Sequence, residues 1–255
     1  MKQGDFTKLA KDYRNRTGYS ERVLRTLASY IGAYQDDFKI ADVGAGTGKL
    51  TEMLLAMGFS GYAVEPNDAM REEGIQICGQ MKQIVWSKGS GEETGLKDNS
   101  VDWLFMASSF HWTDYNKSLR EFHRVLRPGG FFTALWNPRD LDRSPFHKRI
   151  ENMIYEMIPG LNRVSSGSKE YTKGLEEKLL TSGFFDHLLF MEAPHEEIMT
   201  KDRYMGAWRS VNDIQAQAGE AKFQDILQMI ETEIKDMNEV AVPYKTRAWT
   251  VRVKK

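Results

Sequence analysis

Hydrophobic residues near the start of the chain recur every three or four positions, which is the spacing of an amphipathic helix. This spacing predicts a short helix over residues 5–16. Its apolar face carries Phe6, Leu9, Ala10 and Tyr13. A second helical pattern begins at Ser20 and stops at Gly32, because serine caps helix N-termini and glycine ends helices. Two helices joined by a polar linker are therefore expected.

From residue 38 onwards, short apolar runs alternate with amphipathic stretches. The apolar runs predict strands at residues 38–43, 61–65, 84–86, 101–106, 131–136, 188–193 and 248–251. Helices are expected over residues 48–57, from Asn67-Asp68 onwards, and over residues 114–126, 145–158 and 175–181. Alternation of strand and helix is typical of a parallel sheet covered by helices, so the pattern predicts an α/β fold.

The last third of the chain is less regular. Residues 160–172 are polar and are expected to form a loop, and residues 195–239 separate the last two expected strands. The second of these stretches carries Phe223, Ile226, Leu227, Ile230, Ile234 and Met237 at helical spacing. We interpret residues 195–239 as a helical cover inserted before the last strand.

The charge balance argues against nucleic acid as a partner. Lysine and arginine number 35 and aspartate and glutamate 36, which gives a net charge of −1. Long-range attraction to phosphate requires a basic surface, and no block of like charges is present.

Cysteine content and hydropathy indicate the compartment. The single Cys78 excludes an internal disulfide framework and a cysteine zinc cluster, which favours a reducing compartment. No apolar run reaches the length of a membrane span, and the charged start of the chain lacks the apolar core of a secretion signal. We therefore expect a cytoplasmic protein with no membrane partner.

The glycine-rich stretch Asp42-Val43-Gly44-Ala45-Gly46-Thr47-Gly48 follows the first expected strand. Glycines there allow positive φ angles and a close approach of a ligand to the backbone. About twenty residues later, the second strand ends in Glu65, where a carboxylate can accept hydrogen bonds from a ribose. These two signals predict a nucleoside cofactor. The D-x-G-x-G-x-G spacing differs from the G-x-G-x-x-G of dinucleotide sites, and its acid repels phosphate and suits a cation.

The stretch from Asp42 to Gly48 resembles the first motif of class I S-adenosylmethionine-dependent methyltransferases. Glu65 fits the ribose-binding acid of that family, residues 89–96 resemble its adenine loop, and residues 126–130 resemble its turn before the fifth strand. The four features occur in the family's order within residues 38–136. The resemblance implies a Rossmann-like, doubly wound sheet of seven mainly parallel strands, with an antiparallel last strand and a helical cover.

The resemblance also implies a single domain over residues 1–255. Its N-terminal helices, residues 1–35, are expected over the cofactor, and residues 36–138 form the cofactor-binding core. Residues 139–194 and 240–255 complete the sheet, and residues 195–239 are the cover.

S-adenosylmethionine is the cofactor that the resemblance implies. The expected cofactor-binding residues are Tyr13, Arg16, Asp42, Gly44, Ala45, Gly46, Glu65, Pro66, Asn67, Met70, Ser90, Gly91, Glu92, Ala107 and Ser108. In the small-molecule branch of the family, a tyrosine and an arginine of the N-terminal segment fold over the methionine end of the cofactor. For several of these residues a structural role is an open alternative. Tyr13 and Arg16 also fit a surface linker, Asn67 a helix cap, and Met70 plain core.

A His-Trp pair follows the fourth expected strand, at the sheet edge where open α/β sheets bind ligands. Such a pair occurs at this place in methyltransferases that resemble the trans-aconitate methyltransferase group, the type 11 small-molecule branch. His111 is the expected catalytic residue, as a base or as a group that holds a substrate anion, with a structural histidine as the alternative. Asn137, Pro138 and Arg139 follow the fifth strand at the same edge. The substrate residues expected are His111, Trp112, Asn137, Tyr204, Trp208 and Arg209.

These observations predict an enzyme that transfers a methyl group from S-adenosylmethionine to a small acceptor, with a carboxylate or hydroxyl oxygen favoured. In-line displacement at a sulfonium methyl needs positioning and no metal. Two alternatives stay open, a noncatalytic S-adenosylmethionine-binding protein and a nicotinamide-dependent oxidoreductase. The protein is expected to be a monomer or a homodimer.

Overall fold

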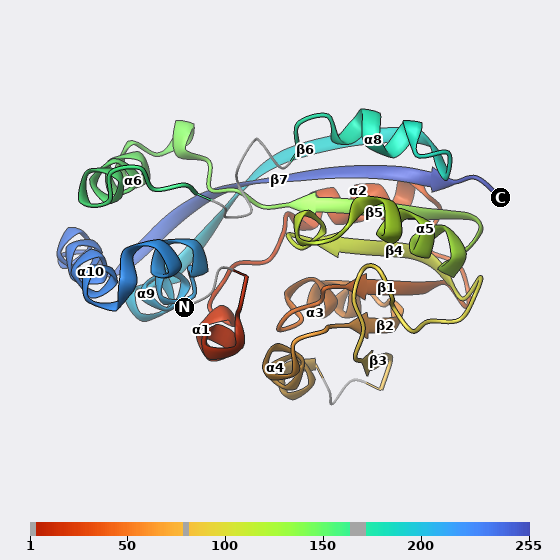
Figure 1. Cartoon of the computed structure of the whole chain (residues 1–255), viewed down its shortest axis with the longest axis horizontal. Helices are drawn as coiled ribbons and strands as arrows, with labels where there is room; N and C mark the ends of the chain where they lie inside the picture. The colour runs from red at the N-terminus through yellow and green to blue at the C-terminus, as the bar shows by residue number, and fades with distance from the viewer. Residues whose placement is uncertain (1–3, 79–81, 164–171) are drawn as a thin grey trace.

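The computed structural model describes residues 4–78, 82–163 and 172–255 (Figure 1). Its centre is a seven-stranded sheet of order β3-β2-β1-β4-β5-β7-β6. The strands are β1 (Lys39–Val43), β2 (Ser60–Val64), β3 (Ile84–Ser87), β4 (Val101–Ala107), β5 (Leu126–Trp136), β6 (Phe185–Thr200) and β7 (Glu239–Val253). β7 pairs antiparallel with both β5 and β6, and the other neighbouring strands are parallel. The predicted fold class is confirmed.

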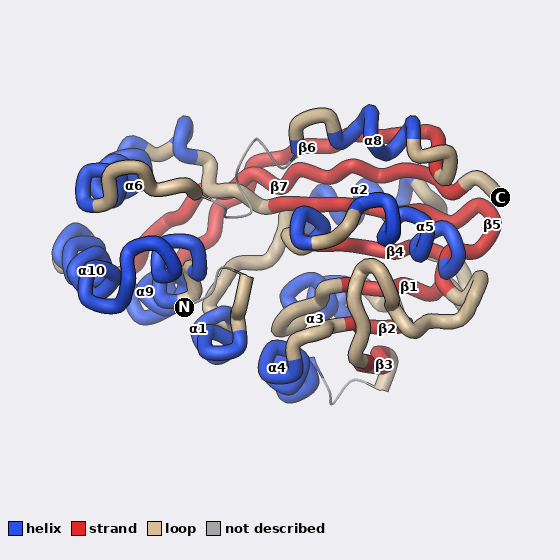
Figure 2. Tube along the Cα trace, in the orientation of Figure 1, coloured by secondary structure: helices blue, strands red, loops and turns tan. Residues whose placement is uncertain are grey.

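Helices lie on both faces of the sheet and beyond one end of it (Figure 2). The 3-10 helices are η1 (Thr7–Leu9), η2 (Phe110–Trp112) and η3 (Leu141–Arg143). The described α-helices are α1 (Ala10–Tyr13), α2 (Glu21–Tyr30), α3 (Lys49–Ala56), α4 (Asp68–Cys78), α5 (Tyr115–Val125), α6 (Pro145–Met157), α8 (Leu175–Thr181), α9 (Lys201–Arg209) and α10 (Asn212–Glu233).

The period of two in each strand divides the core between the two faces of the sheet. Trp103 and Phe105 of β4 pack with α2 and α3 on one face, and Leu104 and Met106 pack with α5 and α8 on the other. All four side chains are almost completely buried, which explains the continuous apolar run of this central strand.

A long hairpin carries the helical cover away from the sheet. β6 and β7 pair from Phe185↔Val253 to Thr200↔Glu239, whereas β5 pairs with β7 only as far as Trp136↔Arg247. The far part of the hairpin therefore extends beyond β5 and ends among α6, α9 and α10, at the left of Figure 1. These three helices share a separate hydrophobic core with the beginning of β7. We call α6, α9 and α10 the cap.

The structure moves the predicted boundaries of the cover. β6 continues through Thr200, so residues 195–200 are strand and the inserted helices begin at Lys201. The sequence pattern did not predict this part of β6, because its charged residues and Pro194 are poor strand formers. An exposed edge strand tolerates such residues. α6, which was expected to belong with the rest of the sheet, packs into the cap through Ile150 and Ile154.

Two other expectations differ in detail. The first helix is a 3-10 turn followed by four α-helical residues rather than a continuous helix over 5–16. α10 is broken at Gly219, whose φ of 73° is left-handed. Of the loop predicted at 160–172, residues 164–171 lie outside the described residues. Within the described ranges, no helix combines the length and apolar character that crossing a membrane requires.

Candidate functional site

The glycine loop leaves the carboxyl end of β1, which lies between β2 and β4. Gly44 and Gly46 have φ angles of 70° and 58°, a region that residues with a Cβ avoid. The N–H groups of Gly44 and Ala45 both donate to the carbonyl oxygen of Val64, at 2.8 and 3.1 Å. The turn is thereby fixed against the end of β2, where the next acidic residue lies.

Glu65 follows β2 and joins the glycine loop to the start of α4. Its Oε2 accepts a hydrogen bond from the N–H of Gly46 at 2.8 Å, and its Oε1 accepts one from the N–H of Asn67 at 2.9 Å. Burial raises the pKa of the Glu65 carboxyl, while the two N–H groups act in the opposite direction. The carboxylate is held in the position expected of a group that accepts from ribose hydroxyls.

Asp42 is the last acid before the glycines and is completely buried. Its Oδ2 accepts a hydrogen bond from the Thr51 hydroxyl at 2.6 Å, whereas its Oδ1 has no partner among the described residues. Burial raises the pKa of this carboxyl to about 7, with a further contribution from the charge of Glu65. An unsatisfied buried carboxylate oxygen fits a ligand that brings a cation or a donor, as the sulfonium and ammonium of S-adenosylmethionine would.

The start of α4 lies beside the same loop. The side chain of Asn67 caps the helix, because its Oδ1 accepts from the N–H of Met70 at 3.1 Å. Its Nδ2 donates to Thr7 of η1 at 3.0 Å, which brings the N-terminal segment to this edge. Met70 is buried, and its Cε would lie 3.3 Å from a Cβ on Gly46. Pro66, between Glu65 and the helix-capping Asn67, is exposed.

The expected adenine loop folds against the start of α5. The N–H of Ser90 donates to the carbonyl oxygen of Glu93 at 2.9 Å and closes a turn. Glu92 accepts from the N–H of Asp114 at 2.8 Å through its Oε1. Gly91 packs so closely that a Cβ there would lie 2.9 Å from Thr113. The loop is thus tied to the segment that follows β4.

Ala107 ends β4, and Ser108 follows it with a φ of 55°, which is unusual for a residue with a side chain. The N–H of Ser108 donates to the carbonyl oxygen of Leu135 at 2.8 Å. Its hydroxyl accepts a hydrogen bond from the Tyr19 hydroxyl at 3.1 Å, and burial raises the pKa of that tyrosine. Tyr19, from the polar linker, was not among the predicted site residues.

His111 occupies η2 and is held in one tautomer. Its Nδ1 accepts a hydrogen bond from the indole N–H of Trp136 at 3.2 Å, so the proton of the neutral ring is on Nε2. Burial lowers the pKa of His111 to about 4. Trp112 is 44% exposed and packs edge-on against Phe6 of the N-terminal segment. This low pKa makes His111 a weak base, and its catalytic role stays a prediction.

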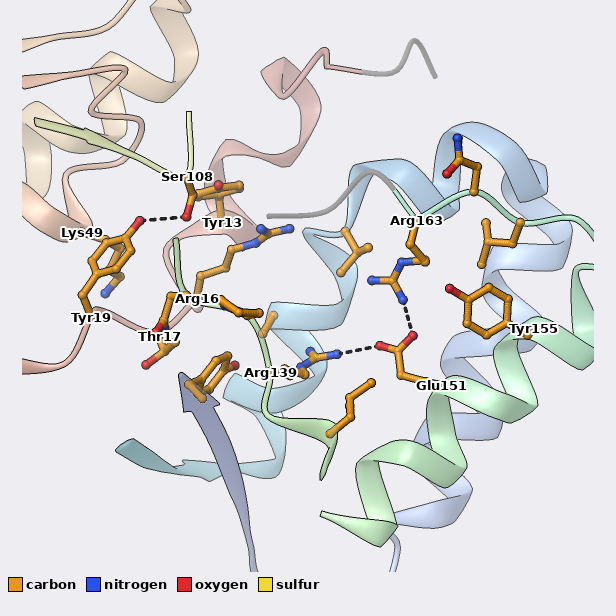
Figure 3. Close-up of a pocket in the computed structure, with 18 residues that line it drawn as sticks. Tyr13, Arg16, Thr17, Tyr19, Lys49, Ser108, Arg139, Glu151, Tyr155 and Arg163 are labelled. Carbon is orange, nitrogen blue, oxygen red and sulfur yellow. Dashed lines mark hydrogen bonds and ion pairs between the residues drawn. The ribbon is translucent and has the colours of Figure 1, made fainter. Parts of the chain in front are cut away.

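A cavity of about 500 Å³ lies between the glycine loop and the cap (Figure 3). Four predicted site residues line it, namely Tyr13, Arg16, Ser108 and Asn137. The other described lining residues are Thr17, Tyr19, Lys49, Pro138, Arg139, Leu141, Glu151, Tyr155, Leu161, Asn162, Arg163, Ala207, Val211 and Tyr244. The linker, the end of β5 and the cap therefore meet around one space.

Arg16 connects the linker to the cap. Its Nε and Nη2 donate to the hydroxyl and the carbonyl oxygen of Ser210, at 2.8 and 3.0 Å. Its guanidinium carbon lies 4.4 Å from the centre of the Tyr13 ring. Asn137 fixes the other side of the linker, because its Nδ2 donates to Gly18 and its Oδ1 accepts from Thr246. Tyr13 and Arg16 are thus built into the cavity wall.

Five of the six predicted substrate residues lie outside the lining of this cavity, namely His111, Trp112, Tyr204, Trp208 and Arg209. Tyr204 and Trp208 are buried in the core of the cap, and Trp208 lies behind Arg139, whose guanidinium carbon is 3.9 Å from its ring centre. Arg209 forms a half-exposed ion pair with Asp12, at 3.2 Å. The helical spacing of α9 explains the difference, since consecutive residues of a helix face different directions.

Some lining residues that were not predicted lie close in the sequence to predicted site residues, and others do not. Tyr19 follows the predicted residue Arg16 by a few positions, and Lys49 follows Gly46 in the same way, so proximity in the chain was a usable signal. Glu151 and Arg163 come from the third of the chain with the weakest pattern, and only the cap's folding brings them to the cavity. Among the described residues, no group of three or more His, Cys, Asp or Glu side chains converges as a metal site.

Comparison with known proteins finds similarity to methyltransferases. Residues 41–134 match a family model described as a methyltransferase domain. An uncharacterized methyltransferase of Mycobacterium tuberculosis is 41% identical over 102 residues, covering 40% of this chain and 41% of that relative. The chain thus spans about two fifths of that relative's length. An uncharacterized methyltransferase of Schizosaccharomyces pombe is 26% identical over 224 residues, which covers 81% of this chain and 82% of that protein.

Solved structures agree on the fold. A protein from Anaeromyxobacter dehalogenans, provisionally described as a type II methyltransferase, has a TM-score of 0.66 at 20% identity, covering 93% of this chain and 97% of that one. Phosphoethanolamine N-methyltransferase 2 of Haemonchus contortus, solved with S-adenosylmethionine, has a TM-score of 0.52 at 16% identity, covering 97% of this chain and 57% of that one. These likenesses show the fold, and the domain match over residues 41–134 and the methyltransferase relatives support a methyltransferase domain. The narrower trans-aconitate methyltransferase-like branch is not confirmed.

Proposed function

We propose that this protein is an S-adenosylmethionine-dependent methyltransferase that acts on a small molecule. The observation that carries the proposal is Glu65, whose two carboxylate oxygens accept from the N–H groups of Gly46 and Asn67. This arrangement fixes an acid beside a left-handed glycine loop at the carboxyl ends of β1 and β2. It suits a nucleoside without a pyrophosphate, since a phosphate would meet the charges of Glu65 and Asp42.

The residues at this edge divide the cofactor between them. Glu65 and the glycine loop would hold the ribose, the Ser90 loop the adenine, and Asp42 the cationic end. Arg16 and Tyr13 would face the carboxylate of the cofactor, because both line the cavity. Hydrogen bonds from Nε and Nη2 of Arg16 to Ser210 hold its guanidinium in the cavity wall. When bound, the cofactor would supply a sulfonium methyl group. The acceptor atom would bond to the methyl carbon, and the electron pair of the C–S bond would stay with the sulfur.

We assign the acceptor to the cavity of about 500 Å³, which is large enough for a small organic molecule and is lined in part by residues of the cap. Its walls would hold the acceptor oxygen in line with the C–S bond, and such positioning supplies most of the acceleration in displacements of this kind. A carboxylate oxygen needs no base. A hydroxyl must lose its proton, and His111, with a pKa near 4, is a poor acceptor for it.

Transfer of a labelled methyl group tests the proposal. The purified protein would be incubated with methyl-labelled S-adenosylmethionine and a small-molecule extract of its source, and labelled products counted. We expect time-dependent labelling that the variant Glu65→Ala largely loses and that Glu72→Ala, an exposed change on α4, retains. Binding of S-adenosylhomocysteine without labelling of any product would favour a noncatalytic binding protein instead.

A further inference from the structure

Arg139 lines the cavity, and its one carboxylate partner among the described residues is Glu151, at 3.6 Å. Arg139 follows β5, and its side chain is 15% exposed. Its guanidinium stacks on the ring of Trp208 at 3.9 Å, which fixes the plane of the fork. No hydrogen bond from the Arg139 guanidinium to an acceptor occurs among the residues that the structure describes. A guanidinium carries five N–H donors, so burying one whose carboxylate partner lies as far as 3.6 Å away is costly unless a ligand supplies further acceptors.

The nearby carboxylates are used mainly by another arginine. Arg163 contacts Glu151 through Nη1 and lies 3.0 Å from Asp213 through Nε. Burial would lower the pKa of Arg163, and the charges of Glu151 and Asp213 outweigh that effect and raise it. Arg139 shares only Glu151, at the longer distance of 3.6 Å. Two carboxylates thus pair with one arginine, while the second keeps donors toward the cavity.

Most of the charged side chains that line the cavity are cationic. Among the described lining residues, Arg16, Lys49, Arg139 and Arg163 are cationic, and Glu151 is the single carboxylate. The electrostatic effect of Arg139 also reaches its surroundings, because after burial its charge is the second cause that lowers the pKa of His147 to about 4. A cavity lined by more cationic than anionic side chains favours a negatively charged occupant over a neutral or cationic one.

Figure 3 shows how this residue divides the cavity. The hydrogen-bonded pair of Tyr19 and Ser108 lies at one end, near the glycine loop, and the pair of Arg163 and Glu151 lies at the other. Arg139 is between them, with its guanidinium directed toward the Glu151 end. An acceptor that reaches the cofactor side with one end can therefore present its other end to Arg139.

We propose that the acceptor is an organic anion with a carboxylate that Arg139 binds through its guanidinium fork, away from the atom that is methylated. The inference rests on the proposed function, because it places the acceptor in the methyltransferase cavity. The planar fork matches the two oxygens of a carboxylate, and the guanidinium carbon lies 3.9 Å from the centre of the Trp208 ring. The carboxylate is not consumed, so the methylated product keeps a negative charge.

The charge of the labelled product and the kinetics of one variant test this inference. A small-molecule extract would be divided on an anion-exchange resin at mildly alkaline pH, and each fraction offered to the protein with methyl-labelled S-adenosylmethionine. We expect the retained fraction to contain the acceptor and the labelled product to bind the resin again. With that fraction, Arg139→Gln should raise KM about 10- to 100-fold, the effect of losing charge-assisted hydrogen bonds. Its affinity for S-adenosylhomocysteine should match that of the wild type.

The matched control is Arg143→Gln, an exposed arginine of η3 outside the cavity lining, which should leave KM unchanged. Labelling confined to the unretained fraction, a neutral product, or an unchanged KM in Arg139→Gln would each overturn the inference and leave the methyltransferase assignment standing. If no fraction is labelled at all, the proposed function fails and this inference fails with it.

Discussion

Asp42 is a completely buried acid, and its burial in the fold shifts its pKa. Burial raises its pKa from 3.8 to about 7, so the folded state binds this proton more tightly than the unfolded chain. Its contribution to stability is complete below the unfolded pKa and is lost as the pH rises through about 7. We expect the melting temperature of the wild type, relative to Asp42→Asn, to fall between about pH 4 and about pH 7. Thermal melts of both ligand-free proteins across that window measure the difference, and a constant difference would contradict this account of Asp42.

His111 should not titrate in the working range of the enzyme. Its Nδ1 accepts from Trp136 and burial lowers its pKa to about 4, so the ring remains neutral above that pH. The ratio of kcat for the wild type and His111→Gln is therefore expected to be constant from about pH 5 to about pH 8. Paired pH–rate profiles measure this ratio. A ratio that declines as the pH falls through the ordinary histidine range would restore the role of general base.

The predictable site residues are those fixed by backbone geometry close to a motif. Gly44, Gly46 and Glu65 follow strands in a defined order, and their hydrogen bonds depend on that order alone. The environment of His111 was not predictable, because the indole that holds its Nδ1 comes from β5. Arg139 could be assigned to the correct edge of the sheet from its place after β5, but its stacking on Trp208 depends on how the cap folds.

Within the glycine loop, two glycines have separable tasks. Both have positive φ, so alanine at either position costs about 1–2 kcal/mol of backbone strain. A Cβ on Gly48 would lie 2.9 Å from Cys78 in the buried layer of α4, whereas a Cβ on Gly46 would meet only the mobile end of Met70 at 3.3 Å. A side chain at Gly46 therefore meets little steric conflict, and the cost to the fold comes mainly from its φ of 58°.

Gly48→Ala should therefore destabilise the protein more, by about 1–3 kcal/mol beyond the shared strain. Gly46→Ala should instead lose affinity for S-adenosylhomocysteine disproportionately, because its methyl group faces the space beside Glu65. Chemical denaturation and titration calorimetry on both variants separate these effects. Equal losses of stability and affinity in the two variants would show that the glycines share one role.

Elements with strong internal patterns were predictable, and elements defined by their partner were not. β4 and α5 have sharp apolar periods and a capping aspartate, Asp114, so their expected and observed bounds nearly coincide. The second half of β6 is charged and alternates exposed and half-buried positions. Its hydrogen bonds to β7 make it a strand, and a single segment does not reveal its pairing partner.

At the scale of the whole molecule, the N-terminal segment joins the two parts that form the cavity. Thr7 accepts a hydrogen bond from Asn67 beside the glycine loop, and Arg16 donates to Ser210 in the cap. The N–H of Gly4 also donates to the side chain of Asn212, at the start of α10. These contacts link residues about 60 to 200 positions apart, which explains why the cap side of the site was the least predictable part.

Titration calorimetry of the wild-type protein tests the central claim, that the glycine loop and Glu65 form an S-adenosylmethionine site. We expect saturable heat with S-adenosylhomocysteine and none with NAD. Glu65→Ala should weaken the affinity by about 1.5–3 kcal/mol, the loss of hydrogen bonds to an ionised group, and Glu72→Ala should not change it. Saturable binding of NAD together with no heat from S-adenosylhomocysteine would contradict the claim and point to a nicotinamide-dependent oxidoreductase.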